Sequence, residues 1–229
     1  MPGRLLRARL EGQGSDGLPF EPQAIGNKTM TTSPIATTAP ITTATTADAE
    51  RAIAVLTLAF SSDPANRWAW PDPRQYLTSF PAFVRAFAGR AFERGTAYCT
   101  TGYAGAALWL PPGVYPDEDA LAALLQSTVA EEDREDLLAV LEQMGAYHPS
   151  EPHWYLPLIG VDPAHQGRGY GSQLLRHALA ACDRDGAPAY LESSNAANIP
   201  LYERHGFEVL GTIRVGASPP IFPMLRTAR

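Results

Sequence analysis

The stretch Val161-Asp-Pro-Ala-His-Gln166-Gly167-Arg168-Gly169-Tyr170-Gly171-Ser172 decides the fold. An apolar run from Trp154 to Val161, the best strand candidate in the chain, comes before it. Helical spacing of apolar residues follows it, at Leu174, Leu175, Ala178 and Leu179. Glycine at three alternate positions lets the backbone approach a ligand closely, whereas a plain turn needs only one glycine. Because a helix start offers unpaired N–H groups and a positive dipole end, the turn is predicted to bind an anion such as pyrophosphate.

Two other phosphate-binding patterns fit this turn less well. A phosphate loop needs Gly-Lys-Ser/Thr, and Lys28 is the chain's only lysine. A dinucleotide fingerprint is matched by Gly167 and Gly169, with Ser172 in place of the third glycine and Glu192 about 20 residues further on. That fingerprint, however, follows its strand directly and belongs to a repeated β-α-β series, neither of which this sequence shows.

A second motif stands at a fixed distance beyond the first. It reads Asn198-Ile-Pro-Leu-Tyr202-Glu-Arg-His-Gly206-Phe207, while the turn itself fits the pattern Q/R-x-x-G-x-G/A. Together the two motifs resemble the acyl-CoA site of the GNAT superfamily of N-acetyltransferases. The resemblance spans about residues 154–207 and extends weakly over residues 41–226.

Within that superfamily the chain is most similar to puromycin N-acetyltransferase-like proteins. The segments that carry this resemblance are Leu58-Ala-Phe60 with Asp63-Pro64, Arg67-Trp68, Ala107-Leu-Trp109, Glu151-Pro152-His-Trp154-Tyr155-Leu156, Leu191-Glu192-Ser and Pro200-Leu-Tyr-Glu-Arg.

The resemblance implies that acetyl-CoA is the co-substrate and that the acetyl group goes directly to an amine in a ternary complex. Backbone groups of Leu158, Ile159, Gly160 and Val161 would pair with the pantetheine arm, and an N–H near Ile159 or Gly160 would stabilise the oxyanion. The pyrophosphate would be held by Gln166, Gly167, Arg168, Gly169, Tyr170, Gly171 and Ser172. Asn198 would bind the pantetheine amide or simply cap the short helix.

The proton transfers need an acid and a base. Tyr202 stands where the family places the acid that protonates the departing thiolate, although a core aromatic is the alternative. Glu192, at a strand end beside the cleft, is the predicted base. Its alternatives are a solvated strand-end acid or a base role for Glu151, His153 or Tyr155.

Aromatic side chains are the candidates for the acceptor pocket. Trp68, Trp70 and Tyr155, with Glu192, are predicted to meet the substrate, whereas Trp109 is better explained by core packing. Trp154 and Tyr155 alternate along a strand, so one is expected to face the cleft and the other the core.

The predicted fold class is α+β: a single GNAT-type domain with a central mixed, mostly antiparallel β-sheet, a splayed strand pair and flanking helices. Strands are expected at residues 41–44, 97–100, 106–110, 154–161, 189–191, 209–215 and 221–225. Helices are expected from residue 48, over 75–94, twice within 117–145, after the glycine turn and over 200–205, with an aromatic loop at 67–71. Residues 1–40 are predicted to be a disordered or extended appendage or a misplaced start. Residues 41–229 are predicted to be the catalytic domain, with 117–145 as a helical insertion.

Composition restricts the other partners. The chain of 229 residues has 24 acids against 18 bases, a net charge of −6, which argues weakly against nucleic acid. No run of 18 apolar residues indicates a membrane span, and two cysteines cannot form a disulfide framework, so a cytoplasmic location is expected. The histidines show no metal-ligand spacing, so no metal is predicted.

The predicted function is therefore acetyl transfer from acetyl-CoA to the amine of a small, partly aromatic molecule, antibiotic-like or a metabolite. Two alternatives remain: acetylation of a protein or peptide, and a silent acyl-CoA sensor. A monomer or a homodimer is expected.

Overall fold

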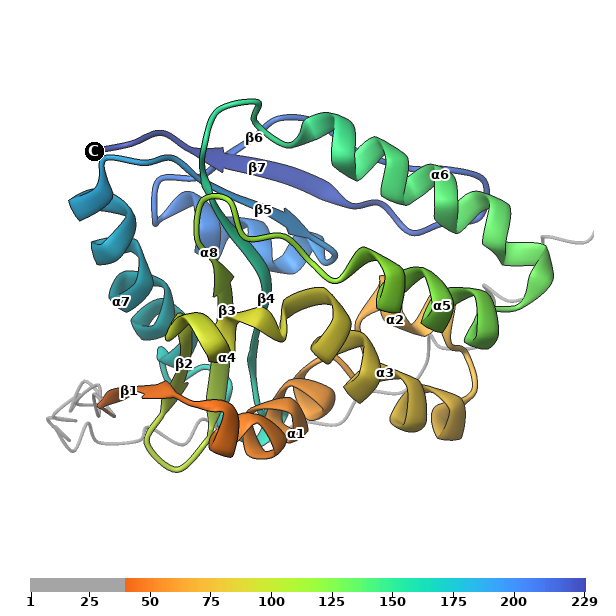
Figure 1. Cartoon of the computed structure of the whole chain (residues 1–229), viewed down its shortest axis with the longest axis horizontal. Helices are drawn as coiled ribbons and strands as arrows, with labels where there is room; N and C mark the ends of the chain where they lie inside the picture. Colours follow the sequence, from red (N-terminus) through yellow and green to blue (C-terminus); the bar gives the residue numbers. More distant parts are fainter. Residues whose placement is uncertain (1–39) are drawn as a thin grey trace, which may run out of the picture. The chain divides into compact units, whose positions relative to one another are not determined.

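The computed structural model describes residues 40–229, so the predicted appendage lies, apart from Pro40, outside the described residues. Its centre is a seven-stranded sheet in the order β1-β2-β3-β4-β5-β7-β6 (Figure 1). The strands are β1 (Ile41–Ala44), β2 (Ala97–Thr100), β3 (Gly105–Leu110), β4 (Trp154–Val161), β5 (Ala189–Ser193), β6 (Glu208–Val209) and β7 (Phe222–Arg226). Every neighbouring pair is antiparallel except β4–β5, which confirms the predicted mixed, mostly antiparallel sheet.

Strands β4 and β5 separate soon after they meet. Their parallel register comprises only Trp154 with Ala189 and Tyr155 with Tyr190, whereas β4 runs on to Val161. On its other side β4 stays paired with β3 as far as Val161, through a register shift that marks a bulge. Bulges bend a strand and redirect its side chains. The second half of β4 therefore leaves β5 while keeping β3, which confirms the predicted splayed pair.

Helices cover both faces of the sheet. One apolar cluster joins the sheet to α1 (Ala49–Ala59), α3 (Pro73–Ala88) and α4 (Arg90–Arg94). A second cluster joins the other face to α7 (Tyr170–Asp185) and α8 (Ile199–Glu203). Short 3-10 turns complete the chain at η1 (Thr46–Asp48), η2 (Pro163–His165) and η3 (Ala196–Asn198).

Three expectations about local structure were wrong. The single helix predicted over residues 75–94 is interrupted at Gly89, where a Cβ atom would lie 2.3 Å from the carbonyl oxygen of Arg85. The predicted aromatic loop is partly helical, because α2 (Pro64–Ala69) begins there with Asp63 capping the N–H of Asn66. The strand predicted over residues 209–215 is only the short β6, followed by an isolated bridge between Ile213 and Ile221.

The region of the predicted insertion forms two helices, α5 (Glu118–Thr128) and α6 (Glu131–Tyr147). Leu121 and Leu125 of α5 join the cluster that contains α3. Val140 of α6 packs instead with Ile213 and Ile221, beside the last strands (Figure 1). Leu137 and Leu141 of α6 also pack against the cluster that α5 joins, so α6 lies between that cluster and the last strands. In the described part of the chain no helix has the length and apolar character needed to cross a membrane.

Candidate active site

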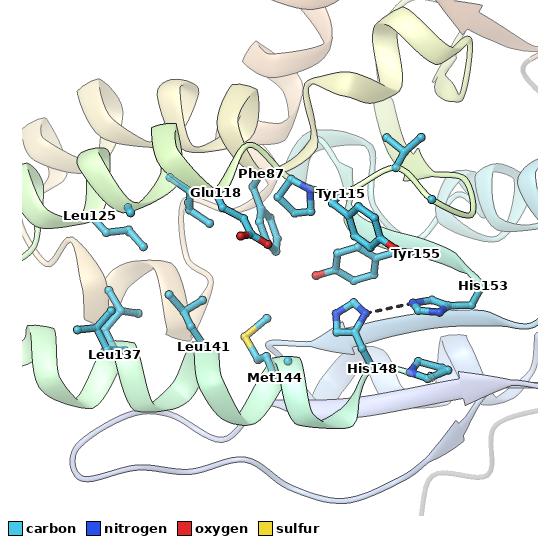
Figure 2. A pocket seen from close by; sticks show the side chains of 18 of the residues that line it. Phe87, Tyr115, Glu118, Leu125, Leu137, Leu141, Met144, His148, His153 and Tyr155 are labelled. Carbon is cyan, nitrogen blue, oxygen red and sulfur yellow. Dashed lines mark hydrogen bonds between the residues drawn. The ribbon is translucent and has the colours of Figure 1, made fainter. Parts of the chain in front are cut away.

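The separation of β4 from β5 opens a small cavity of about 140 Å³. Residues 156–159 of β4 and 191–194 of β5 form its two sides, and Asn198 and Tyr202 also line it. A larger cavity of about 840 Å³ lies between α5 and α6 (Figure 2). Both cavities are lined by the same five apolar side chains, those of Phe87, Leu125, Leu137, Leu141 and Met144. The two spaces therefore adjoin each other beside these helical side chains.

The glycine-rich turn presents backbone N–H groups at the start of α7. Gly167 and Gly169 have φ angles of +75° and +82°, in the left-handed region that glycine adopts without strain. Gly169 is the N-cap of α7 and gives no side-chain cap. The N–H groups of Tyr170, Gly171 and Ser172 consequently have no acceptor within the helix. An anion at this turn would be bound by these donors and by the helix dipole.

Side chains of the same turn brace it. The Gln166 amide donates to the carbonyl oxygen of Val161 at 3.2 Å, and Arg168 donates to that of Ala164 at 3.3 Å. Ser172 Oγ lies 2.8 Å from Nε2 of His205, and Arg176 donates to the same Oγ. These contacts hold the loop in shape.

Two residues of the predicted pantetheine strand are fixed by packing. A Cβ atom on Gly160 would lie 2.5 Å from the Cβ of Ala59, so glycine is what lets α1 approach β4. The side chain of Leu158 is buried in the core beneath that helix. At Leu158 and Gly160 it is therefore the backbone of β4, rather than a side chain, that is left to face a ligand in the splay.

Tyr202 of α8 and Asn198, the residue before α8, also line the small cavity. The Tyr202 ring is buried, and burial together with the Asp63 carboxylate raises the pKa of its hydroxyl. This phenol therefore keeps its proton at neutral pH. Asn198 precedes α8, but its side chain makes no capping hydrogen bond.

Glu192, which lines the small cavity, lies in contact with Tyr155 and His148, which line the larger one. The Tyr155 hydroxyl donates to Oε2 of Glu192 at 2.8 Å, and Nε2 of His148 lies 3.3 Å from Oε1. His148 Nδ1 is in turn 3.1 Å from Nε2 of His153, whose Nδ1 lies 2.8 Å from the backbone carbonyl oxygen of Glu151 (Figure 2). The Glu192 side chain is only 4% exposed, against 29% for His148. A line of polar groups thus runs from the buried carboxylate toward the surface.

The protons along this line can be assigned from its last member. A carbonyl only accepts, so Nδ1 of His153 must donate to Glu151. Burial lowers the pKa of His153, and its neutral ring therefore accepts at Nε2 from Nδ1–H of His148. A neutral His148 then faces the Glu192 carboxylate with a lone pair, unless one proton lies between them. One proton between Nε2 of His148 and Oε1 of Glu192 would complete a hydrogen bond across their 3.3 Å separation.

Comparison with known proteins agrees with this geometry. Residues 102–207 match the sequence model of the acetyltransferase (GNAT) family. An uncharacterized N-acetyltransferase of Schizosaccharomyces pombe is 28% identical over 180 residues, 70% of each chain. A Corynebacterium glutamicum crystal structure, described as histone acetyltransferase HPA2 and related acetyltransferase, superposes with a TM-score of 0.60 and 25% identity, covering 82% of this chain and 96% of that one. The described residues form a single GNAT-type domain, and the GNAT sequence model covers residues 102–207 of it.

GNAT enzymes generally use acetyl-CoA, and the described residues fit it. The uncapped start of α7 offers donors for a pyrophosphate, and the splay offers unpaired β4 backbone for an amide-bearing arm.

The N-alpha-acetyltransferase RimI of Mycobacterium tuberculosis is 40% identical over 78 residues, 33% of this chain and 47% of that protein.

The predicted aromatic acceptor residues fall into two places in this GNAT fold. Tyr155 lines the larger cavity. Its neighbour Trp154 packs on the opposite face of the sheet and donates its indole N–H to Asp185, which confirms the predicted alternation of side chains along the strand. Trp70 is 1% exposed and donates to Thr128 Oγ1, so little more than an edge reaches the small cavity. Trp68 also lines the small cavity, and its indole N–H is buried with no partner among residues 40–229.

Sequence reasoning missed His148 and most of the α5–α6 lining. His148 lies just after α6, and only its place in Tyr147-His-Pro-Ser-Glu-Pro-His153, directly before β4, hinted at a polar cluster. The apolar residues of the larger cavity belong to the two helices of the predicted insertion, but the cavity between those helices was not predicted. Trp109 is buried among core residues, as expected.

Proposed function

We propose that this protein transfers an acetyl group from acetyl-CoA to the amine of a small molecule, antibiotic-like or a metabolite, by direct attack in a ternary complex. One observation carries the proposal: Tyr202 and Glu192 line the same small cavity at the splay, and that cavity adjoins a much larger one. The splay would take the acetyl-pantetheine arm, and the larger cavity would bring the acceptor.

On the cofactor side, the start of α7 would bind the pyrophosphate with the N–H groups of residues 167–172. Gln166, Arg168 and Ser172 would hold that loop in place. Backbone groups at Leu158, Ile159, Gly160 and Val161 would face the pantetheine, and the Asn198 amide, free of capping, would bind one of its amides.

The proton path uses the groups around Glu192. An ammonium group of the acceptor gives a proton to Glu192 and His148, and its nitrogen then attacks the thioester carbonyl. Collapse breaks the C–S bond, and Tyr202 protonates the departing thiolate. His148 and His153 return the accepted proton to solvent, while Tyr202 recovers its own from the nitrogen. One amide, one thiol and one proton result.

On the acceptor side, Tyr155 and Glu192 would meet the amine, with Trp68 and the edge of Trp70 beyond them. The resemblance to puromycin N-acetyltransferase-like proteins supports an antibiotic-like acceptor. We further propose that α5 and α6 are a helical insertion, within a catalytic domain of residues 41–229, that builds this side. A cytoplasmic monomer or homodimer is the proposed form.

Acetylation of a polypeptide is the second candidate, because a third of the chain is similar to the N-alpha-acetyltransferase RimI of Mycobacterium tuberculosis. A silent acyl-CoA sensor is less well supported, since a sensor would need neither a buried phenol nor a buried carboxylate at the splay.

The test is thiol release from acetyl-CoA by the full chain with a panel of primary amines and an N-terminal peptide. We expect turnover with at least one small amine and none without an acceptor. Thermal denaturation with CoA and with pantetheine gives an independent reading, because only CoA carries the pyrophosphate expected to stabilise the start of α7. No acceptor-dependent thiol release would contradict the proposal, and peptide acetylation alone would favour the second candidate.

A further inference from the structure

The larger cavity has the size of a small-molecule site and an apolar wall. Its volume of about 840 Å³ lies within the range of ligand pockets, about 300–1,000 Å³. Leu121 and Leu125 come from α5, and Leu137, Leu141 and Met144 come from α6. Figure 2 shows the labelled side chains of both helices extending into the space between them. Such a wall binds hydrocarbon or aromatic groups rather than charged ones.

Polar groups gather at one end of this space. Tyr155, His148 and His153 lie there, beyond Met144 along α6 (Figure 2). The Tyr155 hydroxyl leads directly to the Glu192 carboxylate. An occupant that fills the apolar part would therefore place only one end against a proton-accepting group.

The charged residues of the lining favour a cation at that end. Glu118 and Glu151 carry carboxylates, and Glu192 lies immediately behind Tyr155. The only arginine of the lining, Arg134, donates its Nε–H to the carbonyl oxygen of Val129. An ammonium group is thus better matched than an anion.

We infer that the cavity between α5 and α6 is the acceptor site, and that the acceptor is a primary amine on an apolar body of at least ring size. This inference rests on the proposed function and names its substrate class. A polyamine would leave further charges against Leu137, Leu141 and Met144, and a peptide would leave backbone polar groups there unpaired.

A series of amines tests this directly with the full chain and acetyl-CoA. The series runs from ethylamine through longer n-alkylamines to phenylethylamine, with spermidine and a lysine peptide as polar counterparts. We expect kcat/KM to rise by about fourfold for each added methylene group that becomes buried. Spermidine and the peptide should remain near the level of ethylamine.

A variant that fills part of the larger cavity tests whether the preference for apolar amines arises there. Leu121→Trp, at a residue that lines the larger cavity and not the small one, should lower the ratio of kcat/KM for phenylethylamine to that for ethylamine by tenfold or more, within the usual range of roughly 10–200-fold for size discrimination in a pocket. Leu77→Trp is the matched control, because Leu77 is 57% exposed on α3 and lies outside both cavities. If Leu121→Trp fails to fold, the amine series on the unaltered protein still decides.

Several results would overturn the inference and leave acetyl transfer intact. These are equal kcat/KM across the alkylamines, a preference for spermidine or the peptide, or a preference for long-chain acyl-CoA with ethylamine, which would assign the cavity to the acyl chain. Absence of thiol release with every acceptor and acyl-CoA would instead contradict the proposed function itself.

Discussion

The carbonyl oxygen of Glu151 fixes how protons are arranged several side chains away. It requires a donor at Nδ1 of His153, and this leaves His148 and Glu192 to share any further proton. A carboxylate alone at a strand end had been expected to act as base. In the structure Glu192 lies beside His148, so the base that we propose is a pair, in which the buried member contacts Tyr155 and the half-buried member leads to the surface.

Replacing His148 tests whether the pair moves a proton. His148→Gln keeps a donor toward His153 but has no group that can take up a proton. We expect kcat near pH 7 to fall on the order of 10²-fold, the lower end for general acid–base catalysis, with added imidazole restoring part of it. His177→Gln, an exposed change on α7, is the control. An unchanged rate and pH–rate profile in His148→Gln would remove His148 from the proton path.

Replacing Tyr202 tests the acid. Tyr202→Phe removes one hydroxyl from a buried ring, so the packing against Phe207 is kept. We expect kcat to fall on the order of 10²-fold, because the thiolate must then leave unprotonated, while the Kd for CoA measured by calorimetry stays nearly constant. Tyr98→Phe, a buried change outside both cavities, should leave kcat unaltered. Equal kcat values for the two variants would end the acid assignment.

At the scale of elements, the strand, turn and helix around residues 154–185 were predicted well because each is encoded locally. The bounds of β4 match the expected run, and Gly167 and Gly169 adopt the positive φ angles that such a turn needs. The break at Gly89 was missed because a single glycine is tolerated in many helices, and the tight approach to Arg85 is visible only in three dimensions. The α5–α6 cavity depends on how far apart two helices are held, which periodicity does not report.

The contact between α1 and β4 yields a prediction about elements. Gly160→Ala would place a Cβ atom 2.5 Å from that of Ala59, so α1 has to move away from the strand. We expect the free energy of unfolding to fall by about 1–3 kcal/mol, as for overpacked cores. Gly145→Ala in α6, where a Cβ atom meets nothing within 4 Å, should raise it by about 0.5–1 kcal/mol. Urea denaturation measures both, and equal stability of the two variants would contradict the close packing.

At the scale of the whole molecule, two histidines couple stability to pH. Burial lowers the pKa of His153 below 6.5, with His148 adding to the effect, and burial with Arg176, Arg204 and Arg226 does the same for His205. The unfolded chain therefore takes up protons at a higher pH than the folded chain does. By linkage, the stability that these residues contribute is present above about pH 6.5 and is lost as the pH falls through their folded-state pKa values.

Thermal denaturation between about pH 7.5 and pH 5 tests this coupling. We expect Tm to fall over that range and the fall to be smaller in the double variant His153→Gln/His205→Gln, since glutamine does not titrate. Asp48 does not contribute in this window: hydrogen bonds from Tyr103 and Thr45 hold the pKa of its carboxyl at about 2, so its contribution is lost only at much lower pH. His177→Gln should keep the full pH dependence. If the double variant loses as much Tm as the unaltered chain, neither histidine is the origin of the acid sensitivity.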